Sequence, residues 1–212
     1  FRTVPGGGRR TPDKNQTTSG NTKAAVKLAK KAIELKPDKP AAYSALGNAH
    51  KLSGDDLRAS ECFLAAMERR RPDSRGWAQA VVEAWDTRRR AAPCGSSELF
   101  CGCERCKALP EKPEWMRSPE ALVAMAERVV AAEPEDGSSW KMHAFAHLEI
   151  KHSSTASKSF TRAAKLFGDQ GSSLDLGLMF QYVSPDDVDM DGVLNDDDDC
   201  PNQAGTSTVD LN

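Results

Sequence analysis

The sequence has few aromatic residues, no long apolar run and no excess of positive charge. Aromatic residues make up only 6% and apolar residues 39% of its 212 residues, a composition that suits packed helices better than a β-sandwich. No run of 18 apolar residues occurs, which excludes a transmembrane helix within these residues. The formal net charge of -2 provides no overall basic field for nucleic acid or a membrane surface. We also find no Ser-His-Asp arrangement and no phosphate-binding loop, and therefore expect no catalysis.

The composition changes along the chain and predicts four parts, one of which contains an insertion. Residues 1–20 are rich in Gly, Pro, Thr and basic side chains without an apolar period, and are expected to be a flexible lead-in. Residues 21–169 have apolar side chains at helical spacing, with an insertion at about 86–118. Residues 170–185 are a predicted capping segment, and residues 186–212 form an acidic segment. Because the chain begins with Phe1 rather than Met, we expect it to be processed or part of a longer protein.

Helical segments within residues 21–169 end at Pro or Gly and share one pattern of large and small residues. The first predicted helix is Asn21 to Lys36, and Pro37 stops it. Small residues in the pattern allow two antiparallel helices to approach closely, while large residues fill the remaining gaps. The pattern positions in residues 40–73 are Tyr43, Leu46, Gly47, Ala59, Phe63, Ala66 and Pro72. They recur as Trp140, His143, Ala144, His147, Ala156, Phe160 and Ala163.

This order of residues resembles the tetratricopeptide repeat. The resemblance implies an all-α solenoid of antiparallel helix pairs, with one repeat split between a helix at Trp77 to Ala84 and a helix at Pro119 to Ala132. It also implies that the first helix of each repeat lines a concave groove that binds a protein or peptide. The groove positions that the resemblance implies are Ser44, Asn48, Lys51, Arg75, Ala78, Val82, Ser138, Lys141 and Phe145. Among them, Lys51, Arg75 and Lys141 favour a partly acidic ligand.

The acidic segment contains oxygen-bearing side chains at alternate positions, which is the arrangement that wraps a loop around one calcium ion. Gly192 would turn the backbone, and the seventh position would supply a main-chain carbonyl. The predicted calcium ligands are Asp187, Asp189, Asp191, the Val193 carbonyl, Asn195 and Asp198. An EF-hand would continue into a helix after the last ligand, whereas here Cys200 and Pro201 follow Asp198. The acidic segment therefore resembles the thrombospondin type 3 repeat. That resemblance implies calcium binding in an oxidising, extracytoplasmic environment.

Four cysteines lie close together inside the predicted insertion: Cys94, Cys101, Cys103 and Cys106. Four thiolates at this spacing could hold a tetrahedral zinc ion, which would fold a loop too short to have its own core. They could equally form two disulfides or remain free thiols, and the redox compartment decides between these states. Cys62 is expected to be a small core residue.

His143 and His147 lie four residues apart on a predicted helix. This spacing could hold a metal ion, but both fall at repeat positions that face the partner helix, and packing is the favoured interpretation.

The sequence therefore predicts a non-catalytic, extracytoplasmic adaptor whose repeats bind a protein while calcium orders the acidic segment. An intracellular assembly factor with a zinc-binding insertion, and an accessory region of a larger enzyme, are the alternatives. Because repeats of this kind serve many pathways, the resemblance does not identify the partner.

Overall fold

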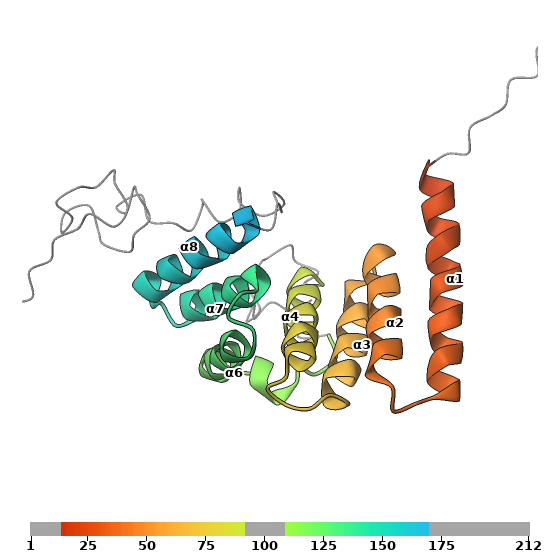
Figure 1. The fold of residues 1–212 in the computed structure, drawn as a ribbon, viewed down its shortest axis with the longest axis horizontal. Coiled ribbons are helices and arrows are strands. Elements are labelled where there is room, and N and C mark those ends of the chain that lie inside the picture. Colours follow the sequence, from red (N-terminus) through yellow and green to blue (C-terminus); the bar gives the residue numbers. More distant parts are fainter. Residues whose placement is uncertain (1–13, 92–108, 170–212) are drawn as a thin grey trace, which may run out of the picture.

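The computed structural model describes residues 14–91 and 109–169, and of residues 14–20 it describes the backbone alone. Within these ranges the chain contains α-helices, one short 3-10 helix and no strand. Figure 1 shows α1 to α4 side by side in a row, which α6, α7 and α8 continue at a different tilt. The elements are α1 (Lys14–Leu35), α2 (Pro40–Leu52), α3 (Asp56–Glu68), α4 (Arg75–Arg90), η1 (Glu114–Met116), α6 (Pro119–Ala132), α7 (Gly137–Glu149) and α8 (Ser153–Asp169).

Consecutive helices pack against one another along the whole row. The pairs α2 with α3, α4 with α6, and α7 with α8 are in contact, and α1, α3 and α6 each also contact the next helix along the chain. The prediction of an all-α solenoid of helix pairs is confirmed for the described residues. The cysteine cluster and the acidic segment lie outside the described ranges. Among the helices that are described, none is long and apolar enough to cross a membrane.

Two boundaries differ from those that the sequence predicted. Helix α1 begins at Lys14, so residues 14–20 of the predicted flexible lead-in are helical. Extending an existing helix costs little once its first turn has formed, which allows α1 to continue through Gly20 toward the amino terminus. Helix α4 ends at Arg90, so the insertion leaves the helix after residue 90 rather than near residue 86.

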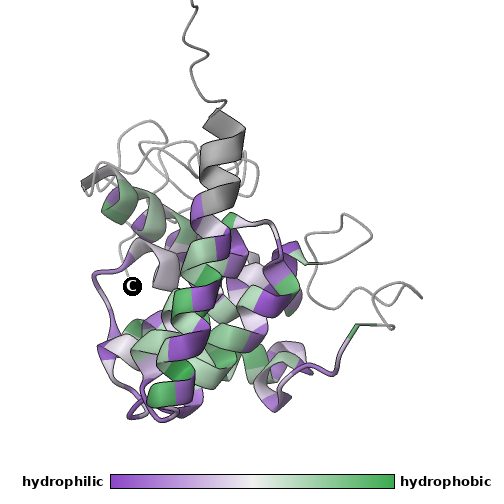
Figure 2. Cartoon of the chain, turned by 90° about the vertical axis from the view of Figure 1, so that its right-hand side faces the viewer, coloured by the Kyte–Doolittle hydropathy of each residue, from purple (hydrophilic) through white to green (hydrophobic). Residues whose placement is uncertain are grey.

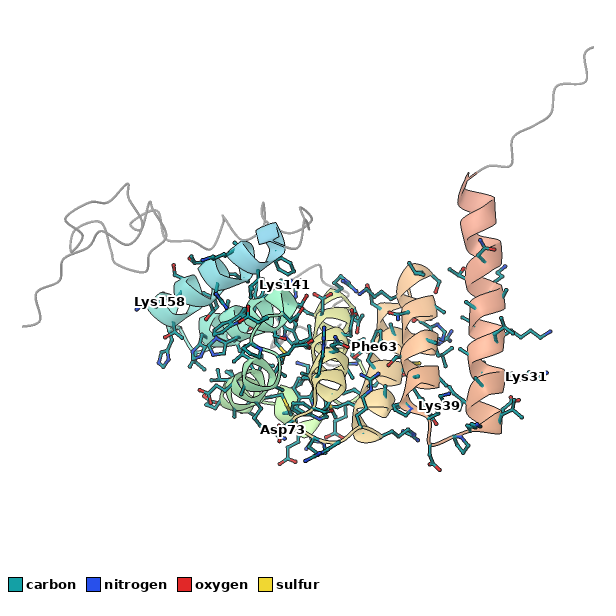
Figure 3. The ribbon with its side chains drawn as sticks, viewed as in Figure 1. Lys31, Lys39, Phe63, Asp73, Lys141 and Lys158 are labelled. Carbon is teal, nitrogen blue, oxygen red and sulfur yellow. The ribbon has the colours of Figure 1, made fainter. Side chains whose placement is uncertain are left out.

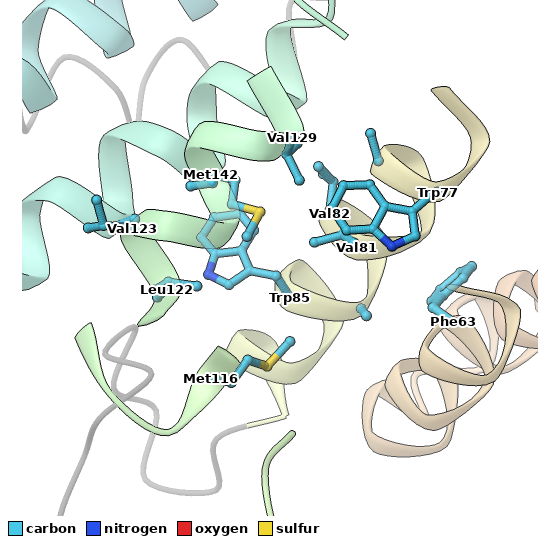
Figure 4. Close-up of a cluster of buried hydrophobic side chains, with 14 of the residues drawn as sticks. Phe63, Trp77, Val81, Val82, Trp85, Met116, Leu122, Val123, Val129 and Met142 are labelled. Atoms are coloured by element: carbon cyan, nitrogen blue, oxygen red, sulfur yellow. The ribbon is translucent and has the colours of Figure 1, made fainter. Parts of the chain in front are cut away.

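The main core lies between α3, α4 and α6, and it includes the far end of the insertion (Figure 4). Trp85 of α4 is 1% exposed and Met116 of η1 is fully buried in the same cluster. Trp115, predicted as an anchor of the insertion, packs partly buried against this core. The return from the insertion to α6 is therefore fixed by apolar contacts.

The first complete helix pair, α2 and α3, depends on Gly47. A Cβ atom at this position would lie 2.9 Å from the Phe63 ring, closer than van der Waals contact allows. Ala59 and Ala66 of α3 are fully buried, as expected for small residues that let two helices approach. Gly54, in the turn between the helices, has a φ of 78°, which glycine adopts without strain.

Candidate functional site

The first helices of the three repeats, α2, α4 and α7, border one continuous hollow. Its volume is about 300 Å³. Residues of these helices, of α3 and of the two connections that lead into α4 and α7 contribute to its wall. The lining residues are Ser44, Asn48, Phe63, Arg70, Gln79, Ala80, Val82, Glu83, Asp136 and Ser138. Four of the nine predicted groove positions, Ser44, Asn48, Val82 and Ser138, line this hollow, and the other five do not.

On α4, one of the three predicted groove positions, Val82, lines the hollow. Gln79 and Glu83 line it together with Val82, whereas Ala78 is fully buried in the core. Gln79 and Glu83 come after Arg75 at four-residue steps, and such residues lie on one side of a helix. Because a period of 3.6 residues fits steps of three and of four equally well, the sequence pattern alone did not choose this face.

Each of the three predicted groove cations lies beside a carboxylate. Lys51 Nζ is 2.7 Å from Glu83 Oε2, and Arg75 Nε is 2.6 Å from Glu133 Oε1. Lys141 Nζ is 3.7 Å from Asp86 Oδ1 (Figure 3 shows Lys141 on α7). These pairs weaken the positive field from which the sequence pattern favoured an acidic ligand.

Glu133 is the most buried carboxylate of this region, with 8% of its surface exposed. Its Oε1 accepts hydrogen bonds from Arg75 Nε and from Gln79 Nε2, the latter at 3.2 Å. Burial, and then the nearby charge of Asp136, raise the pKa of Glu133, while Arg75 and Gln79 act in the opposite direction. Its Oε2 has no hydrogen-bond partner among the described residues. The pair between Arg75 and Glu133 thus joins the start of α4 to the end of α6, although the Arg75 side chain itself is exposed.

Arg70 is the cation that the sequence pattern missed. Its Nη2 donates to Ser44 Oγ at 3.1 Å, and its Nη1 donates to the Gly76 carbonyl. It forms no ion pair with any carboxylate in residues 14–91 or 109–169. Arg70 lies in the connection after α3, outside the repeat's helical periodicity, so no periodic signal could have identified it.

Asn48 and Phe145 occupy equivalent places in different repeats but have different surroundings. Asn48 is exposed and lines the hollow. Phe145 is half-buried, with its ring centroid 5.7 Å from Trp85 and 5.2 Å from Phe160. Asn48 is thus available to a ligand, whereas Phe145 joins the packing of α4, α7 and α8.

His143 and His147 are both buried on α7, and His143 faces the partner helix α8. His143 Nδ1 lies 2.8 Å from Ser159 Oγ of α8. Burial, with a further contribution from His147, lowers the pKa of His143 to about 4. Burial also lowers the pKa of His147. The contact with Ser159 confirms that His143 packs between the two helices.

The predicted metal ligands are not placed by the structure. Asp187, Asp189, Asp191, Val193, Asn195 and Asp198 lie outside the described residues, as do Cys94, Cys101, Cys103 and Cys106. No group of three or more His, Cys, Asp or Glu side chains in the described part of the chain could hold a metal ion. Cys62 is a half-buried free thiol, and burial is the main cause that raises its pKa to about 11.

The sequence was then compared with known proteins. Residues 17–54, which span most of α1 and all of α2, match the family model described as TPR repeat. No curated protein matches the chain. TPR repeats generally mediate interactions between proteins, which is consistent with a groove bordered by α2, α4 and α7.

Proposed function

We propose that the chain is a non-catalytic scaffold that binds a segment of another protein in the groove bordered by α2, α4 and α7. The observation that carries the proposal is the single hollow that all three of these helices line. A ligand that crosses several repeats at once gains contacts from each of them, which is how helical solenoids bind extended partners. The TPR repeat match supports this class of function.

The chemistry of the hollow suits the main chain of a peptide. Asn48 and Gln79 supply amide donors and acceptors, and Ser44 and Ser138 supply hydroxyl groups. An extended peptide has unpaired N–H and C=O groups that such side chains can satisfy. Arg70, which has no carboxylate partner among the described residues, adds a site for one acidic side chain or carboxylate of the ligand.

Lys51, Arg75 and Lys141 have a different role in this proposal. Because each is paired with a carboxylate, the negative charge of that partner opposes the binding of a further anion beside it. Such pairs contribute to the choice and orientation of a ligand more than to its affinity. The expected ligand is therefore polar with one acidic group, rather than strongly acidic.

A peptide-binding screen tests the groove. Peptides selected against the intact chain from a random library would be titrated by fluorescence anisotropy against the variants Asn48→Ala and Arg70→Ala. We expect each variant to weaken binding about tenfold, as for a central contact of an interface. Lys158→Ala, on an exposed position of α8, is the control and should change nothing. Equal affinities of all variants would reject the groove as the binding site.

The acidic segment is proposed to bind calcium through Asp187, Asp189, Asp191, Val193, Asn195 and Asp198. Support comes from the alternation of oxygen-bearing side chains in the sequence. Calorimetric titration of calcium should give one saturable site that is lost in the double variant Asp189→Ala/Asp191→Ala. An unchanged titration in that variant would reject this ligand set.

The state of Cys94, Cys101, Cys103 and Cys106 decides the compartment. Two disulfides support the proposed extracytoplasmic location, whereas a bound zinc ion supports the intracellular alternative. Intact mass without reductant, before and after chelation, distinguishes the two by a loss of four hydrogens or by the mass of one zinc ion.

A further inference from the structure

Helix α1 has two apolar sides, and only one of them is covered. On the side that faces α2, Ala29 is 7% exposed, and Val26 and Ile33 are half-buried. On the other side, Leu28 is 68% exposed and Leu35 is 73% exposed. Figure 2, which looks onto this outer side, shows apolar positions among the hydrophilic ones along α1. A helix that keeps apolar residues on both sides is built to lie between two neighbours.

The uncovered residues have a heptad spacing. Ala25, Leu28, Ala32 and Leu35 are exposed, and the steps between them are three, four and three residues. Alternating steps of three and four are the a and d positions of a coiled-coil seam. Alanine at a with leucine at d lets a second helix approach closely while leucine fills the space between the helices. The outer side of α1 is thus shaped for another helix rather than for an extended strand.

Two lysines lie beside this seam. In the same register Lys31 takes the g position, and Lys36, the residue directly after the end of α1, follows at e, whereas Ala29, the e position of the preceding heptad, is buried on the side that faces α2. Figure 3 shows Lys31 pointing away from α2. Both lysines are exposed, and neither forms an ion pair with another described residue. Lys23, Lys27 and Lys30 add positive charge on the same helix, against Glu34 alone.

We propose that the outer face of α1, formed by Ala25, Leu28, Ala32 and Leu35 with Lys31 and Lys36, is a docking surface for an amphipathic helix of another protein. That helix has an apolar ridge bordered by Asp or Glu. The lysines argue against a second copy of the chain as the occupant, because in a pair of α1 helices lysine would face lysine in either orientation. None of these six residues lines the groove, so this surface is separate from the peptide site.

The probe for this surface is a synthetic helical peptide of about three heptads, with leucine at a and d and glutamate at e and g. A control peptide has lysine at e and g instead. Fluorescence anisotropy with the full chain should show binding of the glutamate peptide, weakened by added salt, and weaker binding of the lysine peptide.

Variants of the chain test which residues are responsible. The double variant Leu28→Ser/Leu35→Ser should weaken binding of the glutamate peptide by at least about tenfold, since both leucines would be buried at the contact. Leu52→Ser is the matched control, because Leu52 is 72% exposed on α2, and it should leave binding unchanged. Lys31→Glu/Lys36→Glu should reverse the preference, so that the lysine peptide binds more tightly.

Several outcomes would overturn the proposal. One is that neither peptide binds the chain, and another is that both bind equally. A loss of binding in Leu52→Ser equal to that in the double leucine variant would show non-specific adhesion. Dimerisation of the chain in sedimentation that Leu28→Ser/Leu35→Ser abolishes would identify a second copy as the occupant. Asn48→Ala should leave peptide binding at α1 intact, which separates this test from the test of the groove.

Discussion

The helix pairs α2 with α3 and α7 with α8 adopt the same arrangement with different chemistry at equivalent positions. Leu46 and Cys62 of the first pair correspond to His143 and Ser159 of the last. In the first pair these residues are a buried leucine and a half-buried thiol, and in the last they form a hydrogen bond of 2.8 Å. The comparison shows that this position between the helices takes an apolar residue in one pair and a hydrogen-bonded polar pair in the other.

The two pairs also differ in how their second helices connect to the next part of the chain. Ser60 of α3 donates to the Ala84 carbonyl of α4 at 2.9 Å. Ser157 occupies the equivalent position of α8, and its buried hydroxyl has no partner in the described part of the chain. The serine hydroxyl thus joins α3 to α4 by a hydrogen bond, whereas the equivalent hydroxyl of α8 makes no such bond in the described part of the chain.

The largest loss of stability is expected when the buried phenylalanine that both pairs contain is replaced by alanine. Phe63→Ala and Phe160→Ala should each lower the free energy of unfolding by about 3–5 kcal/mol, because each removes a nearly fully buried ring. Urea denaturation monitored by circular dichroism measures the loss. If Phe160→Ala costs less than about 1 kcal/mol, the two pairs are not packed alike.

Acid should weaken the last pair more than the first. The pKa of His143 falls from 6.5 to about 4 in the folded protein, so the unfolded chain takes up a proton at a higher pH than the folded chain does. The stabilisation that depends on neutral His143 is therefore complete above about pH 6.5 and is lost as the pH falls toward 4. Denaturation midpoints measured between pH 6.5 and 4 give the slope of stability against pH.

The control for this pH dependence is the double variant His143→Leu/Ser159→Cys, which gives the last pair the residues of the first. It should have a smaller loss of stability between pH 6.5 and 4, with His147, whose pKa burial also lowers, contributing to the remainder. An unchanged slope would show that His143 is not the responsible group.

Substitutions at the close contact between the two helices of each pair should lower the free energy of unfolding by less than the loss of a buried ring. Gly47→Ala places a Cβ atom 2.9 Å from the Phe63 ring and should destabilise the protein by about 1–2 kcal/mol, despite the better helix propensity of alanine. Ala144→Gly, at the equivalent position of α7, should cost about 1 kcal/mol through propensity and a lost contact. A stabilising Gly47→Ala would mean that Phe63 moves aside without strain.

The smallest loss of stability is expected when the ion pair between Lys51 and Glu83 is removed. Lys51→Leu gives α2 the residue found at the equivalent position of α7, Leu148, and removes the ion pair with Glu83. Both side chains are about one-third exposed, so the expected loss is below about 1 kcal/mol and shrinks further in high salt. Urea denaturation at two salt concentrations tests this, and a loss above about 2 kcal/mol would assign the pair a structural role.

The repeat pattern predicted the positions of helices better than it predicted the binding surface. Pro119 to Ala132 was predicted as a helix from its apolar spacing, with the bounds that the structure has, and Ser118 caps it in the structure. On α4, Gln79 and Glu83 line the groove where Arg75 and Ala78 were predicted, because helical spacing fixes a stripe and not its edges. Arg70 was missed because it lies in a connection.

The amino-acid sequence by itself determined that residues 21–169 form mainly helices, where most of them end, and which small and large residues pack between them. These properties depend on local spacing, caps and proline positions, which act over a few residues. Only the tertiary structure decided that Lys51, Arg75 and Lys141 are paired with carboxylates, that Arg70 is not, and that the outer leucines of α1 are uncovered. Those partners lie in other helices or connections, and their distances depend on how the helices stack.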